Sequence, residues 1–242
     1  MSSSFDSVYA RPVAESGVTE RLGFLRRVYG WMTVALAITA GGAALSIQSG
    51  LALKILQAGN FGIILFSIGW MGIGWLAQKV RHTPILNMVA FTGYALYTGA
   101  IVSSIVYIAM LMGRALEGSS MTYVYQALFL TVLVFGGLTV YTFFTKRDFS
   151  FLSGFLFIAS IALVGLSLMN MFIFHGTTFS LIVSFLGVMI FSGYILFDTQ
   201  KILKAYPANE HLAGAITLFT DFVLLFMHIL RIILILASSS RR

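Results

Sequence analysis

The chain of 242 residues has no cysteine and only three prolines. Charged residues are also few, since only 10% of the residues are Asp, Glu, Lys or Arg. The lack of cysteine excludes disulfide bonds, thiolate metal sites, haem-attachment motifs and a cysteine nucleophile. A soluble domain carries about 25% charged and about 45–50% apolar residues. Here 59% of the residues are apolar and the mean hydropathy is +0.95. The composition therefore excludes an ordinary soluble domain, and also collagen, a coiled coil and a disordered chain.

Seven long apolar segments occupy most of the chain, with short polar segments between them. A helix needs about 20 residues to cross the hydrocarbon core of a bilayer, and no segment alternates with the period of two of a barrel strand. We therefore predict an all-α polytopic membrane protein with seven transmembrane helices. The predicted spans are Val28–Ile47, Phe61–Ala77, Ile85–Met112, Tyr123–Phe144, Phe151–Phe174, Phe179–Phe197 and Leu212–Ala237.

The first 20 residues, Met1–Glu20, are polar and contain three of the eight acids. They are predicted to form a cytoplasmic tail before a single transmembrane domain, residues 21–242. Three arginines then precede the first apolar segment, and small residues follow at 40–44, which is also the pattern of a cleaved signal peptide. The long tail and the six further apolar segments favour an uncleaved first helix.

The net charge of +7 would indicate a nucleic-acid partner in a soluble protein, but here the basic residues lie mainly between the spans and indicate topology. With the N-terminus in the cytoplasm, the positive-inside rule fits an N-in, C-out chain with seven spans. The basic C-terminal tail is the exception, and it leaves open a seventh segment that re-enters the membrane. The cytoplasmic segments carry Arg11, Arg21, Arg26, Arg27, Lys79, Arg81, Lys146, Arg147, Lys201 and Lys204, and the outer ones carry Lys54, Arg114, Arg241 and Arg242.

Two acids lie in apolar sequence: Asp198 near the end of the sixth span and Asp221 in the seventh. An acid at the centre of a membrane helix costs roughly 2.5–3.5 kcal/mol on insertion scales, so two in consecutive spans need an explanation. At about 1.5 Å of rise per residue, Asp198 lies about 7 Å before the cytoplasmic end of its helix, and Asp221 about 13 Å into the next helix. Antiparallel packing of these helices would bring the two carboxyl groups together in the cytoplasmic half of the bundle.

Two carboxylates in a low-dielectric site do not readily both ionise, so such a pair holds a proton near neutral pH. A doubly ionised pair attracts cations, and calcium prefers carboxylate oxygens. We therefore predict that Asp198 and Asp221 form a pH-sensing pair that binds calcium transiently. The alternative is that each acid is satisfied separately. Asp198 lies one turn before Lys201 and could pair with it, whereas Asp221 has no basic residue within four positions.

Other polar residues in or beside the spans are candidates for accessory roles. His228 lies two turns after Asp221 on nearly the same face. It could extend a proton path, or it could simply hydrogen-bond to a neighbouring helix. Arg231 lies near the outer end of the last span, where its side chain can snorkel to the interface. Lys79 and Arg81 lie at the cytoplasmic end of the second span.

Small residues recur at helical spacing in two spans, as Ala37/Gly41 and as Ala95/Gly99/Ser103. Small residues on one face of a membrane helix allow a neighbouring backbone to approach closely. These two sets therefore predict close helix packing and carry no chemistry of their own.

Four sequence motifs are distinctive, and two of them contain the buried acids. They are Phe197-Asp198-Thr-Gln, Leu218-Phe-Thr-Asp221-Phe-Val-Leu-Leu-Phe-Met-His-Ile-Leu-Arg231, Phe24-Leu-Arg-Arg-Val-Tyr-Gly-Trp-Met-Thr33 and Gly93-Tyr-Ala-Leu-Tyr-Thr-Gly99. Together they resemble the Bax inhibitor-1 family (transmembrane Bax inhibitor motif proteins), and in particular its bacterial YccA/YbhL-type members. The resemblance covers roughly residues 21–237.

The resemblance implies a seven-helix fold in which a central seventh helix is enclosed by the other six. It also implies a location in a bacterial inner membrane and a pH-sensitive calcium leak, with Asp198 and Asp221 as the sensor. The family pattern includes an arginine of the second helix that alternates between the two acids. The span Phe61–Ala77 contains no arginine or lysine, which leaves the partner of the pair in doubt.

Two other classes of function compete with an ion leak. Paired aspartates sharing a proton also serve aspartyl proteases, including intramembrane ones. However, two features speak against an intramembrane aspartyl protease: Asp221 follows Leu-Phe-Thr rather than Gly-x-Gly, and all three prolines precede the last span. The metalloprotease motif His-Glu-x-x-His is absent as well. We therefore expect that the protein is not an enzyme and that it binds no cofactor. The other alternative is an interaction protein that modulates a membrane-bound AAA protease, or a stress or cell-death response, without conducting ions.

Overall fold

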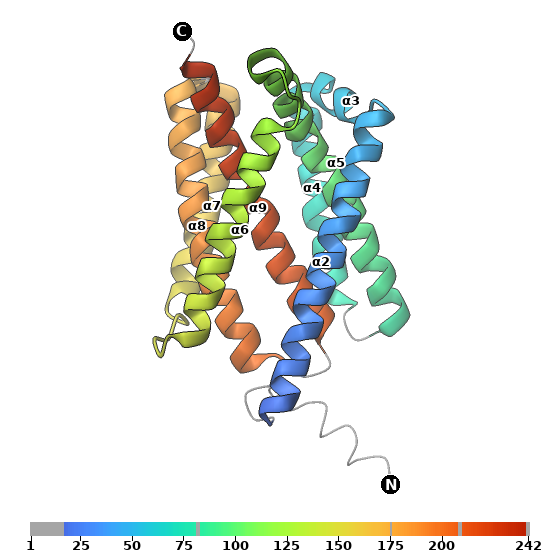
Figure 1. The fold of residues 1–242 in the computed structure, drawn as a ribbon, viewed down its shortest axis with the longest axis vertical. Helices are drawn as coiled ribbons and strands as arrows, with labels where there is room; N and C mark the ends of the chain where they lie inside the picture. Colours follow the sequence, from blue (N-terminus) through green and yellow to red (C-terminus); the bar gives the residue numbers. More distant parts are fainter. Residues whose placement is uncertain (1–16, 81–82, 175, 208–209, 241–242) are drawn as a thin grey trace.

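The computed structural model describes residues 17–80, 83–174, 176–207 and 210–240. Within these residues, seven helices are long and apolar enough to cross a membrane, which confirms the predicted all-α membrane fold (Figure 1). They are α2 (Val18–Gln48), α4 (Gly59–Lys79), α5 (Pro84–Glu117), α6 (Thr122–Phe144), α7 (Leu152–Met169) with the π-helix η2 (Asn170–Phe174), α8 (Thr177–Ala205) and α9 (His211–Ser239).

Two helices extend beyond their predicted spans. The helix α2 begins at Val18, ten residues before the predicted start, because arginine is a good helix former and Phe24 is fully buried in this first part. The last three residues of the predicted tail therefore belong to α2, and residues 1–16 lie outside the described part. The helix α8 continues to Ala205, so Asp198 lies inside it. It ends where Pro207 favours the extended conformation seen at Tyr206.

Two short elements were not predicted. A helix of seven residues, α3 (Leu51–Gln57), joins α2 to α4. It follows Gly50, whose φ of 76° is a left-handed conformation that favours glycine. The last turn of the fifth span is the π-helix η2.

The two ends of the bundle differ in charge. The end at which α2 begins also holds the end of α4, the α6–α7 connection and the end of α8 (Figure 1). We call it the basic end, because the segments there carry Lys79, Lys146, Arg147, Lys201 and Lys204. The continuous helix α9 runs from this end to the opposite one, which we call the far end. The seventh segment therefore crosses the whole bundle, and the alternative of a re-entrant segment is wrong.

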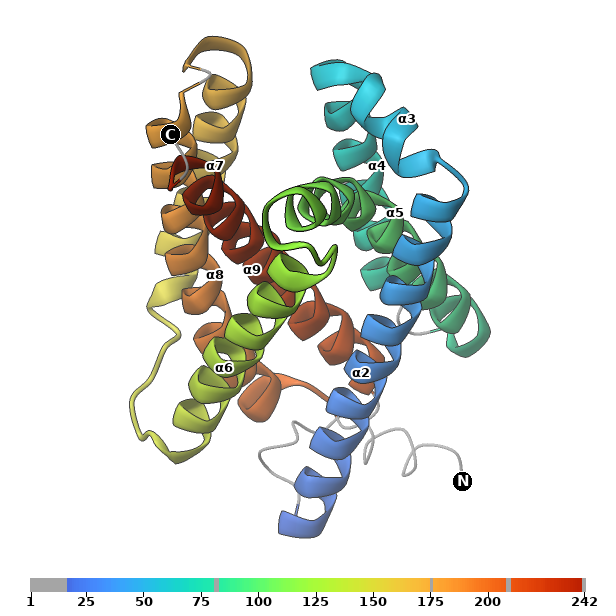
Figure 2. The ribbon, with the colours of Figure 1, turned by 45° about the horizontal axis from the view of Figure 1, so that its top comes forward.

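The helix α9 lies at the centre of the bundle. It packs against α2, α4, α5, α6 and α8, whereas α7 packs against α8 on the outside (Figure 2). Residues around the whole circumference of α9 are buried, among them Leu218, Phe219, Leu225 and Leu230, which are fully buried. A helix that is apolar all round belongs inside a bundle rather than on its surface.

The close packing of α2 against α5 depends on small residues. A Cβ at Gly99 would lie 2.5 Å from the Thr39 carbonyl oxygen, and one at Gly42 would lie 3.1 Å from the Leu96 carbonyl oxygen. Ala95 and Ser103 are fully buried, which fits the predicted small face of α5. The predicted face of α2 was wrong by one position, because Gly42 makes the contact and Gly41 faces open space.

We predict that Gly99→Ala destabilises the fold. The added methyl group meets backbone atoms of α2, which cannot move aside as a flexible side chain can, and overpacking of this kind costs about 1–3 kcal/mol. The measurement is the thermal unfolding midpoint of the purified protein in detergent. Gly93→Ala is the matched control, because Gly93 lies on the same helix with nothing near its Cβ position. A Gly99→Ala midpoint as high as that of Gly93→Ala would contradict the packing.

Candidate functional site

Asp198 on α8 and Asp221 on α9 lie side by side in the interior. Their carboxyl groups are in hydrogen-bonding contact, and the two residues are only 8% and 5% exposed. The two helices are consecutive and pack against each other. The arrangement thus places together the two acids that the sequence singled out. A hydrogen bond between two carboxyl groups requires a proton on one of them.

Asp198 forms no ion pair with Lys201, although both residues are in the described part of the chain. The Lys201 ammonium group lies 5.7 Å from the centre of the Phe197 ring, within the range of a cation–π contact. The Lys201 charge interacts with Asp198 electrostatically, without direct contact. The alternative in which each acid is satisfied separately therefore does not describe Asp198, whose carboxyl contact is Asp221.

A hydrogen-bonded network of α4, α5 and α9 lies next to Asp221. The hydroxyl groups of Tyr94 on α5 and Thr220 on α9 lie 2.9 Å apart, and Tyr94 is close enough to Asp221 to interact electrostatically. The Trp70 indole N–H of α4 donates to the Thr98 hydroxyl, which donates in turn to the Tyr94 carbonyl oxygen. The network connects α4 and α5 to the residue beside Asp221.

The second span contacts α9 through a neutral side chain. The Gln78 amide of α4 donates to the Thr217 hydroxyl at 3.3 Å, one turn before Asp221. Lys79 is exposed and lies over the Trp75 ring of its own helix, at 4.7 Å, so it does not reach the pair. Arg81, the other basic candidate, lies outside the described residues. The described part of α4 therefore contacts α9 near the pair through the uncharged side chain of Gln78.

Three buried hydroxyl groups gather around Thr199, the residue after Asp198. Tyr29 of α2 lies next to Thr139 of α6 and Thr199 of α8. None of the three hydroxyl oxygens has a hydrogen-bond partner in the described chain, and neither has Oδ2 of Asp221. The interior near the pair thus holds several buried polar oxygen atoms in addition to the two carboxyl groups.

His228 does not join the acid pair. It lies seven residues after Asp221, which is about 10 Å along the helix axis. Its ring stacks on Phe191 of α8, with centroids 5.6 Å apart, and a Cβ at Gly187 would overlap it. Its Nδ1 atom is buried without a hydrogen-bond partner. His228 therefore packs against α8, and the expected hydrogen bond to a neighbouring helix is absent from the described residues.

Arg231 follows one turn after His228 and is about 15 Å along α9 from Asp221, so it too lies apart from the pair. Its side chain is half-buried near the far end, and it interacts with His228 through space. In the described residues, no group of three or more histidines, aspartates or glutamates could hold a metal ion. The oxygens available for a cation at this site are those of Asp198, Asp221 and the neighbouring hydroxyl groups.

Seven helices long and apolar enough to cross a membrane, with α9 at the centre and a buried carboxyl pair on the last two, define a polytopic membrane protein. The family model described as "Inhibitor of apoptosis-promoting Bax1" matches residues 21–240, so the chain belongs to the Bax inhibitor family. This confirms the family resemblance of the four motifs.

Relatives occur in animals, fungi and bacteria. Protein lifeguard 4 of Mus musculus is 28% identical over 226 residues, 93% of this chain and 90% of that protein. Bax inhibitor 1 of Schizosaccharomyces pombe is 30% identical over 223 residues, 92% and 80% of the two chains. Inner membrane protein YbhL of Escherichia coli is 30% identical over 242 residues, 91% and 96% of the two chains. These names describe inhibitors or membrane proteins rather than enzymes.

We predict that Gly187→Ala destabilises the protein and that His228→Ala relieves the effect. The new methyl group overlaps the His228 ring, and such overpacking costs about 1–3 kcal/mol. Thermal unfolding of the two single variants and the double variant forms a double-mutant cycle. Gly165→Ala, which meets open space on α7, is the control. Additive effects of the two substitutions would contradict the contact.

Proposed function

We propose that the chain is a pH-sensitive cation leak pathway of the membrane, with calcium as the ion, and that protonation of Asp198 and Asp221 controls it. The observation that carries the proposal is the buried contact of the two carboxyl groups on consecutive membrane helices. Intramembrane acids are expensive and commonly mark ion pathways and proton relays. Two such acids that share a proton make the α8–α9 contact depend on pH.

The physical basis is the strength of charge repulsion in the interior. With one shared proton, the carboxyl groups hold each other through a charge-assisted hydrogen bond. Without it, two like charges face each other where the dielectric constant is far below that of water. The contact between α8 and α9 at this point then becomes unfavourable, and the doubly ionised pair attracts a cation. The number of bound protons thus determines both helix contact and cation affinity.

The polar residues around the pair provide oxygens for an ion that sheds part of its water. Asp198 lies seven residues before the end of α8, and Thr139 lies five residues before the end of α6, or about 10 Å and about 8 Å from those ends. Closer to the basic end, the hydroxyl oxygens of Tyr206 and Thr217 lie 3.4 Å apart. Ion pathways are lined by such oxygen atoms, which replace hydration.

The basic end is proposed to face the cytoplasm. Its loops carry the lysines and arginines that the positive-inside rule places there, and this puts the N-terminus inside. The location proposed is a bacterial inner membrane, as named for the relative YbhL.

Modulation of a membrane-bound AAA protease, or of a stress or cell-death response, is the alternative that requires no conduction. The names of the relatives, such as Bax inhibitor 1, favour an inhibitory role in those proteins. That role would be separable from the acid pair. It is indicated if both aspartates can be neutralised without changing ion flux.

We predict that Asp198→Asn and Asp221→Asn each abolish the pH dependence of calcium flux. An amide does not titrate; it can donate a hydrogen bond to an ionised carboxylate or accept one from a protonated carboxyl group, so the contact between α8 and α9 persists at every pH. The measurement is calcium entry into liposomes that contain the purified protein, followed with an indicator dye over a pH series. A pH dependence that persists in both variants would refute the sensor.

Asp148→Asn is the control for this experiment. Asp148 is exposed in the α6–α7 connection, 3.5 Å from Lys204. Hydrogen bonds from the Ser150 amide and hydroxyl hold the pKa of Asp148 below its ordinary value. It therefore stays ionised from mildly acidic to alkaline pH, and its loss should leave the shape of the pH profile unchanged.

We also predict that the double variant Thr139→Val and Thr199→Val lowers the flux severalfold and leaves its pH dependence in place. The change removes two buried hydroxyl oxygens that neighbour Tyr29, one of them on the residue after Asp198, but keeps the acid pair and nearly the same side-chain shape. Thr131→Val is the control, because this buried threonine of α6 bonds to the Ala127 carbonyl oxygen of its own helix. Equal flux in the double variant and in Thr131→Val would contradict a route past these hydroxyl groups.

A further inference from the structure

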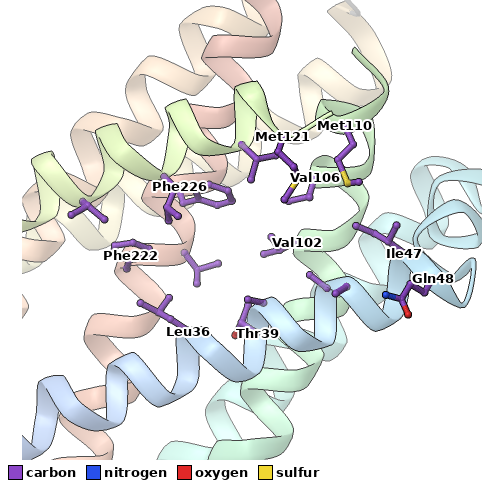
Figure 3. A pocket seen from close by; sticks show the side chains of 17 residues that line it. Leu36, Thr39, Ile47, Gln48, Val102, Val106, Met110, Met121, Phe222 and Phe226 are labelled. Atoms are coloured by element: carbon purple, nitrogen blue, oxygen red, sulfur yellow. The ribbon is translucent and has the colours of Figure 1, made fainter. Parts of the chain in front are cut away.

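An apolar pocket of about 620 Å³ lies between α2 and α6. The two helices flank the pocket and each packs against α5 and α9, which close it from behind (Figure 3). Its floor consists of Phe222, Val223 and Phe226 of α9, and its back wall includes Val102 and Val106 of α5. All five of these residues are less than one-tenth exposed.

The mouth of the pocket opens sideways through the bundle wall. On α2 the small residues Ala40 and Ala44 are exposed, and on α6 Leu128 and Val132 are exposed, so these four residues form the two rims. All lie well inside helices that cross the membrane. What meets this mouth is therefore the hydrocarbon part of the bilayer.

The length of the pocket matches one leaflet. Its lining on α2 runs from Leu36 to Gln48, which is about 18 Å of helix, and half of a bilayer's hydrocarbon core is about 15 Å thick. Its lining on α6 runs from Val132 to Met121, next to the start of that helix. The pocket thus extends from the middle of the bundle to the far end. It is an elongated space parallel to the helices, as a lipid chain requires.

The chemistry of the lining suits a hydrocarbon chain. Among the described residues, none with a charge lines the pocket, and the Thr39 hydroxyl is already bonded to the Ala95 carbonyl oxygen. The remaining polar side chain is Gln48 at the far end, which makes no hydrogen bond to the described chain. An apolar chain with a polar group at the far end satisfies both features.

We propose that this pocket binds one acyl chain of a phospholipid from the leaflet at the far end, with Gln48 at the level of the polar headgroup. The chain enters between the rims of α2 and α6 and contacts Phe222 and Phe226 on the floor. The inference depends on the pocket and its place in the membrane, and it is independent of the proposed ion leak.

The test uses the unmodified chain in vesicles of a phospholipid whose acyl chain carries a photoactivatable diazirine. After irradiation, digestion and mass spectrometry locate the lipid adducts. We expect adducts on the segments 222–226 and 102–106, which bulk lipid does not reach because their pocket residues are buried. Adducts confined to lipid-facing residues such as Phe129 and Ile158, which are 64% and 68% exposed, would overturn the proposal.

A blocking variant makes the test specific. Ala40→Phe together with Ala44→Phe adds bulk to the rim, and it should lower the pocket adducts severalfold while the adducts on Phe129 persist. Ala37→Phe is the matched control, because Ala37 is exposed on the same helix but does not line the pocket. Pocket adducts that survive the double substitution would overturn entry between α2 and α6. A second copy of the chain captured at the rims by a separate bifunctional cross-linker, with no lipid adducts in the pocket, would show a protein occupant and overturn it as well.

Discussion

The contact between the carboxyl groups of Asp198 and Asp221 is the interaction on which this account depends. A bilayer interior offers no water to a polar group, so an acid placed there must find its partners within the protein. The two acids meet because α8 and α9 are consecutive, antiparallel and packed together. Their contact is favourable when one carboxyl group carries a proton, but two ionised carboxylates would repel each other. Under the proposed function, this contact between α8 and α9 is also what responds to pH.

Most of the fold could be predicted from the sequence, because a membrane span is recorded in hydropathy alone. Helix ends were harder to predict. The start of α2 was missed because charged residues can continue a helix past the apolar segment, and the end of α8 was missed for the same reason. The face of α2 that meets α5 was displaced by one residue, since one position turns a helix by about 100°. Rotation about a helix axis depends on neighbours that a single segment does not reveal.

Only the charged residues of the site could be predicted from the sequence. Acids are rare in apolar sequence, so Asp198 and Asp221 stand out by themselves. Their neutral partners do not, because threonine and tyrosine occur throughout the spans and many of the threonines bond to a carbonyl oxygen of their own helix. Gln78 and Tyr94 became visible only through contacts with α9. Conversely, His228 lies on nearly the same face as Asp221, but the structure places it in a separate contact with α8.

The central helix also connects the acid pair to the apolar pocket. Asp221 and Phe222 are adjacent on α9, and Phe222 belongs to the pocket floor. One side of α9 thus faces the carboxyl group of α8, and another faces a space that opens toward lipid. A displacement of α9 at the acid pair would therefore also move the pocket floor, and the reverse, because protein interiors are close-packed and transmit strain.

The most direct measurement is an infrared pH titration of the membrane-embedded protein that follows the C=O stretch of protonated carboxyl groups. We expect one such band near neutral pH, present in the unmodified chain and missing from both Asp198→Asn and Asp221→Asn. A spectrum with no protonated carboxyl band at neutral pH, or a band that survives both substitutions, would contradict the shared proton.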